Sequence, residues 1–86
     1  MGPENPDLAT ALGNLALIVQ ASGRSEQAES LYRRALAIRE RSLGETHPLV
    51  ADSLEALSAA LAKADRADEA RALKERAEQI RASSEP

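Results

Sequence analysis

The sequence predicts an all-α protein built as a short stack of two helical repeats. When residues 5–44 are aligned with residues 47–86, a shift of 42 positions, 12 of the 40 pairs are identical. Apolar residues recur at helical spacing in both halves, and no stretch alternates as a half-buried strand does. Alanine, the best helix former, is abundant. A fixed period of this length is typical of a solenoid, in which each unit buries its apolar face against its neighbours.

The first repeat, about residues 6–44, is predicted to contain two helices. Asn5-Pro6-Asp7 is a helix start, with an N-cap, a proline in the first turn and an acid near the positive end. Gly23 supplies a permissive backbone at the end of this helix. Ser25 is expected to cap the second helix, which Gly44 ends. The apolar positions of the first helix are Leu8, Leu12, Leu15 and Val19.

The second repeat, about residues 48–82, follows the same pattern. His47-Pro48 stands where Asn5-Pro6 stood, and Ala64-Asp65-Arg66 replaces the glycine turn. The last helix is expected to fade over residues 82–86. The apolar positions of the two helices are Val50, Leu54, Leu57, Leu61, Ala70, Leu73, Ala77 and Ile80.

Matched apolar residues in the two repeats predict the core. Truncation of Leu15 or Leu57 to alanine is expected to cost about 2–5 kcal/mol, which is the usual range for a buried leucine. The predicted core residues are Leu12, Leu15, Ala28, Leu31, Ala35, Leu54, Leu57, Ala70, Leu73 and Ala77.

Length and composition limit the classes of function. The 86 residues form one domain (1–86) with a net charge of −3, from 11 basic and 14 acidic residues. This balance, together with a single aromatic residue, Tyr32, argues against a nucleic-acid partner. There is no cysteine, and no apolar run is long enough to span a membrane. We therefore expect no membrane partner and a cytoplasmic location.

No constellation of residues points to catalysis, a cofactor or a metal. His47 is the only histidine, and Glu45 and Asp52 nearby do not complete a ligand set or a base with its partner. We interpret His47 as a turn residue before Pro48. The basic residues of segment 33–41 are interleaved with Glu29 and Glu40 and spread round a helix, which predicts a solvated helix face rather than a phosphate site. The sequence thus predicts a protein that is not an enzyme.

Several of these residues resemble the tetratricopeptide repeat (TPR) signature over about residues 5–82. The resemblance lies in Asn14-Leu15-Ala16, Gly23-Arg24, Ala28, Leu31-Tyr32 and Ala35-Leu36. The long period and the segment 43–51, with its His-Pro, are similar to the kinesin-light-chain type. The second repeat departs from the signature, with Ser58 matching Ala16 and Asp65 matching Gly23. The resemblance implies two helix-turn-helix repeats, four antiparallel helices in a right-handed α-solenoid, and a role in protein binding.

The resemblance also implies a concave groove lined by the first helix of each repeat. In the kinesin-light-chain type, the asparagine at the position of Asn14 holds a peptide backbone, and Ala56 has lost it in the second repeat. The alternative interpretation is a solvated face of a longer array. The expected groove residues are Thr10, Asn14, Leu17, Gln20, Asp52, Glu55 and Lys63.

The two ends of the predicted stack differ. Tyr32 and Leu36 are matched by Lys74 and Glu78, so the last helix has the polar outer face of a terminal cap. The first helix shows no such change, and an apolar strip would lie exposed on it. This strip, a predicted self-association face, comprises Leu8, Ala11 and Ile18.

Three functional hypotheses remain open at this point. The first is a non-catalytic interaction module or scaffold that binds a peptide or partner protein in the groove. The second is a structural element that forms a homodimer through the exposed first helix. The third is an excised or engineered fragment of a repeat array with no independent function.

Overall fold

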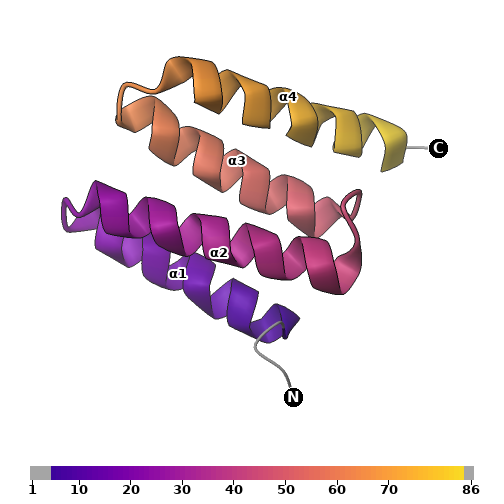
Figure 1. Cartoon of the computed structure of the whole chain (residues 1–86), viewed down its shortest axis with the longest axis horizontal. Helices are drawn as coiled ribbons and strands as arrows, with labels where there is room; N and C mark the ends of the chain where they lie inside the picture. Colours follow the sequence, from indigo (N-terminus) through magenta and orange to yellow (C-terminus); the bar gives the residue numbers. More distant parts are fainter. Residues whose placement is uncertain (1–4, 85–86) are drawn as a thin grey trace.

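Four α-helices form a flat stack in the computed structural model, which describes residues 5–84 (Figure 1). They are α1 (Pro6–Ala21), α2 (Ser25–Leu43), α3 (Pro48–Lys63) and α4 (Ala67–Ser84). Helix α1 packs against α2, α3 packs against α4, and contact between α2 and α3 joins the two hairpins. The stack measures 39 × 34 × 15 Å, with α1 and α4 at opposite ends. The predicted all-α fold of two helix pairs is confirmed.

The two hairpins begin with the same capping geometry from different residues. The Asn5 side chain accepts a hydrogen bond from the backbone N–H of Asp7 at 2.7 Å. His47 accepts one through Nδ1 from the N–H of Leu49 at 3.0 Å. Each satisfies a backbone donor that has no partner inside the helix. His47 is therefore an N-cap residue, in the position expected for the start of the second repeat.

The turns inside the two hairpins also correspond. Gly23 has φ +90°, and Asp65, its match 42 residues later, has φ +61°. Both lie in the left-handed region, which glycine adopts without strain and which aspartate tolerates better than most residues. The expected cap at Ser25 is wrong: Arg24 is the N-cap residue of α2 and makes no side-chain cap hydrogen bond. The last helix was expected to fade from residue 82, but α4 continues to Ser84. Residues 85–86 lie outside the described part.

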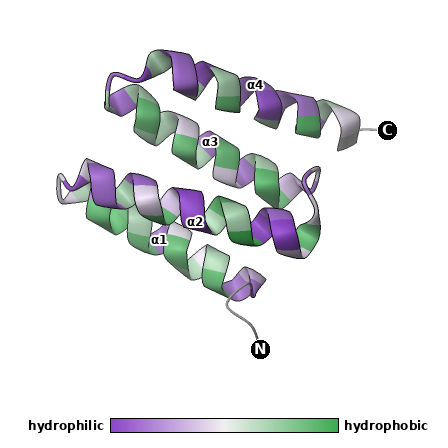
Figure 2. Cartoon of the chain, viewed as in Figure 1, coloured by the Kyte–Doolittle hydropathy of each residue, from purple (hydrophilic) through white to green (hydrophobic). Residues whose placement is uncertain are grey.

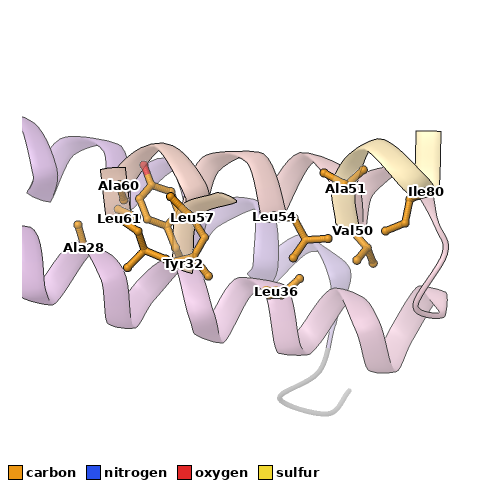
Figure 3. Close-up of a cluster of buried hydrophobic side chains, with 13 residues drawn as sticks. Ala28, Tyr32, Leu36, Val50, Ala51, Leu54, Leu57, Ala60, Leu61 and Ile80 are labelled. Carbon is orange, nitrogen blue, oxygen red and sulfur yellow. The ribbon is translucent and has the colours of Figure 1, made fainter. Parts of the chain in front are cut away.

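The largest fully buried side chains come from α3, which packs against both α2 and α4. Figure 3 shows Leu54, Leu57 and Leu61 of α3 pointing into the same cluster as Tyr32 and Leu36 of α2. Ile80 of α4 and other residues complete it. A second, smaller cluster, between α1 and α2, contains Ala9, Leu12, Ala35 and Ile38.

The predicted core is confirmed at seven positions, and one prediction is wrong. Leu31 and Leu73 are half-buried, while Leu15 is 46% exposed. The reason is its place in the stack: α3 has a helix on both sides, whereas α1 has α2 on one side and no described helix on the other. The seven buried positions are Leu12, Ala28, Ala35, Leu54, Leu57, Ala70 and Ala77.

Candidate protein-interaction groove

A groove of about 250 Å³ runs between α1 and α3, with α2 as its floor. The wall from α1 carries a hydroxyl, an amide and an exposed leucine, and the wall from α3 carries a carboxylate. The other lining residues of these two walls include Ala9, Gly13 and Ala56, whose side chains are small or absent. The lining residues are Ala9, Thr10, Gly13, Asn14, Leu17, Tyr32, Ala35, Arg39, Asp52, Ser53 and Ala56.

Four of the seven residues predicted for the groove line it: Thr10, Asn14, Leu17 and Asp52. The other three do not. Gln20 accepts a hydrogen bond from the Tyr32 hydroxyl at 3.3 Å. Glu55 lines a different cavity and binds Arg81, and Lys63 is exposed at the end of α3.

The Asn14 side chain is available to a ligand. It is exposed on α1, and no described residue forms a hydrogen bond with it. An amide offers two donors and an acceptor, which matches the paired N–H and C=O groups of an extended peptide. Ala56, which matches Asn14 in the second repeat, lines the facing wall without any polar side-chain atom.

Arg39 of α2 forms hydrogen bonds with both walls of the groove, a role that the sequence did not reveal. Its Nη1 atom donates to the Leu49 carbonyl oxygen at 3.2 Å and to Ser53 Oγ at 2.9 Å. Its Nη2 atom donates to Thr10 Oγ1 at 3.2 Å. One side chain of α2 therefore fixes α1 and α3 relative to each other. The only sequence signal was the identity of Arg39 and Arg81, and the expectation of a solvated face is wrong here.

Arg81 occupies the position of Arg39 in the second repeat, and its partners lie within its own hairpin. It donates to Asp52 at 2.5 Å and to Glu55 at 2.8 Å, both on α3. Asp52 is the match of Thr10, so the bond from Arg81 to Asp52 repeats the bond from Arg39 to Thr10 within the other hairpin. The hydrogen bond from Arg81 lowers the pKa of Glu55 below its ordinary value, and the same contact raises the pKa of Arg81.

A second cavity, of about 530 Å³, opens between α3 and α4. Most of its lining residues are small, and Lys74, the exposed match of the buried Tyr32, also lines it. Ser58, one of its lining residues, donates to the Ala70 carbonyl oxygen at 2.7 Å and so joins α3 to α4. The lining residues are Glu55, Ser58, Ala59, Ala62, Ala67, Ala70, Arg71 and Lys74.

The outer helices have different surfaces. In Figure 2, α4 is coloured largely as hydrophilic, whereas α1 is mostly hydrophobic. Ile18 is 67% exposed, and Leu17 is 58% exposed. Of the predicted self-association residues, Ile18 and Ala11 are exposed and Leu8 is half-buried.

Neither a metal centre nor a membrane span is found in the described part. Residues 5–84 contain no group of three or more ligating side chains that could hold a metal ion. None of the helices in this range is long and apolar enough to cross a membrane.

Two stacked helical hairpins with a groove between their first helices define an α-helical repeat protein. The chain matches the Tetratricopeptide repeat family over residues 2–83, and it belongs to that family. No curated protein matches it. Members of this family generally bind other proteins and are typically non-catalytic.

Proposed function

We propose that this chain is a protein-interaction module that binds an extended peptide segment in the groove between α1 and α3. The observation that carries the proposal is the unpaired Asn14 amide on the wall of a preformed groove. In this proposal the amide pairs with the peptide backbone, and Leu17 covers an apolar side chain of the ligand. Asp52 borders the opposite side.

The groove, about 250 Å³ in volume, is already formed in the chain without a ligand. The three hydrogen bonds of Arg39 hold its walls in place before any ligand arrives. A rigid site lowers the entropy cost of ordering on binding.

The test is a peptide selection with matched variants. A peptide is selected from a random displayed library against the full chain, and its Kd is measured by titration calorimetry. Asn14→Ala is expected to weaken binding by about tenfold or more. Lys63→Ala, which is outside the groove, should leave Kd unchanged. Ala56→Asn, which restores the matching amide, should tighten it. Equal Kd values for the parent chain and Asn14→Ala would reject the proposal.

Two further parts of this proposal concern the type of repeat and the location of the protein in the cell. We propose that the repeats are of the kinesin-light-chain type, because the second helix, α2 (Ser25–Leu43), is long and is followed by His47-Pro48. We also propose that the module acts without catalysis or a cofactor, in the cytoplasm. The balanced charge of the chain supports a protein as its partner.

The second candidate function is a homodimer through α1, using Leu8, Ala11 and Ile18. The observation in its favour is the 67% exposure of Ile18, since contiguous exposed apolar residues mark interaction sites. Light scattering on a sizing column should then give a dimer mass that Ile18→Glu reduces to that of a monomer. A monomer mass across the concentration series would reject this candidate.

A further inference from the structure

The outer face of α1, defined by Leu8, Ala11, Leu15 and Ile18, has a buried counterpart within the same chain. The residues that match it on α3 are Val50, Ser53, Leu57 and Ala60, and all four are buried. Helix α2 packs against α3. The packing of α2 on α3 therefore shows which kind of helix covers such a face. This surface lies apart from the groove, so the inference goes beyond the proposed function.

Helix α2 combines apolar and acidic side chains at its junction with the second hairpin. Tyr32 and Leu36 are buried in the cluster that they share with α3. Glu29, three residues before Tyr32, pairs with Arg66. Glu40, four residues after Leu36, pairs with Arg76 at 2.6 Å. The junction thus consists of an apolar pair with a glutamate on each side, and each glutamate meets an arginine of the next repeat.

The first repeat carries both matching arginines. Arg24 matches Arg66, and Arg34 matches Arg76, 42 residues apart in each case. No carboxylate among the described residues pairs with Arg24 or Arg34. At the second hairpin, α2 packs on an apolar face and pairs with Arg66 and Arg76. The first hairpin has the matching apolar face and the matching Arg24 and Arg34, but no described helix packs on them.

A second copy of this chain is a poor occupant. Its exposed end helix, α4, has Arg71, Lys74, Glu78 and Ala82 in the places of Glu29, Tyr32, Leu36 and Glu40. Arg71 would lie opposite Arg24, and Glu78 would be buried against leucine, which is costly for an unpaired charge. Two α1 faces brought together would offer no carboxylate to Arg24 or Arg34 from the faces themselves.

We infer that the outer face of α1 binds an amphipathic helix with the chemistry of α2. Its apolar face carries an aromatic residue and a leucine four positions apart. One glutamate precedes this pair by three residues, and another follows it by four. The glutamates pair with Arg24 and Arg34, and the apolar residues cover Leu15 and Ile18.

The first test uses a synthetic peptide with the sequence of residues 25–43, labelled for fluorescence anisotropy and titrated with the full chain. Saturable binding is expected. Ile18→Glu in the chain should weaken it by about tenfold or more. Reversing both glutamates of the peptide (Glu29→Lys, Glu40→Lys) should do the same, and Arg24→Glu with Arg34→Glu in the chain should restore it. A peptide of residues 67–84 is the negative control.

The groove proposal can fail independently of this one. Asn14→Ala acts in the groove and should leave the Kd of the helical peptide unchanged. Binding that is insensitive to Ile18→Glu would overturn the inference, because the peptide would then lie elsewhere. A dimer of the chain alone that excludes the peptide would also overturn it, in favour of self-association.

A second measurement covers the case in which the isolated peptide does not bind because it is unfolded. A second copy of residues 6–47 is inserted between residues 5 and 6, which places an α2 sequence directly before α1. The urea midpoint should rise above that of the parent chain. The control carries Tyr32→Lys and Leu36→Glu in the added copy and should give a smaller rise. Equal midpoints for these two chains, together with no peptide binding, would overturn the inference.

Discussion

Leu15 and Leu57 are the same residue at the same position of two repeats, yet one is 46% exposed and the other is completely buried. Both lie in the first helix of a hairpin. Helix α3 packs against both α2 and α4, whereas α2 is the only described helix against which α1 packs closely. Burial in this chain is therefore set by the place of a helix in the stack, not by the residue alone.

The same comparison applies to the second helices. Tyr32 and Leu36 of α2 are buried against the next hairpin, whereas Lys74 and Glu78 of α4 are exposed. The stack is therefore polar at the α4 end and apolar at the α1 end. A polar terminal face keeps a repeat protein soluble, and an apolar one is a surface for a partner.

The largest expected effect is at the buried member of the pair. Leu57→Ala should lower the free energy of unfolding by about 2–5 kcal/mol, because it leaves a cavity between α2, α3 and α4. The measurement is urea denaturation followed by circular dichroism. A loss well below 1 kcal/mol would mean that Leu57 is not held between two helices.

The two turns provide the next comparison. Gly23→Ala should cost about 1–2 kcal/mol, since φ +90° is unfavourable for a residue with a Cβ atom. Asp65→Gly should stabilise the chain, because Asp65 has φ +61°. Thermal melts of the two variants should move in opposite directions. Shifts of the same sign would contradict the equivalence of the two turns.

The two caps predict an effect of similar or smaller size. His47→Ala removes the acceptor for the Leu49 N–H and should cost about 0.5–2 kcal/mol. His47→Asn places at α3 the residue that caps α1 and should retain most of the stability. If both substitutions cost the same in denaturation experiments, the side chain of His47 does not act as a cap.

The smallest effect is expected at the ion pair of the last helix. Arg81 lowers the pKa of Glu55 in the folded chain, so the pair stabilises the fold at neutral pH. This contribution is lost as the pH falls from the ordinary value of 4.5 through the lowered folded pKa. Arg81→Gln should therefore lower the Tm slightly at pH 7 and not at pH 3. A gap in Tm that persists at pH 3 would contradict this assignment.

The helical periodicity and the 42-residue repeat were sufficient to predict the fold, because the start of each hairpin and the turn within it have a local chemical signal. The groove was expected from the family resemblance, and Thr10, Asn14, Leu17 and Asp52 line the groove of the structure. Two features could not be predicted. Alignment of the repeats assigns equal burial to Leu15 and Leu57, since it contains no information on which neighbours are present. Arg39 lies in a mixed-charge segment, and only the packing of three helices shows that its partners are neutral oxygens.

The most direct test of the account compares Leu15→Ala with Leu57→Ala by urea denaturation of the chain alone, at low concentration. The account predicts a loss of about 2–5 kcal/mol at Leu57 and about 1 kcal/mol or less at the half-exposed Leu15. Adding the helical peptide of residues 25–43 should enlarge the loss at Leu15 alone. Equal losses at the two positions without any partner would contradict the claim that the α1 face is open.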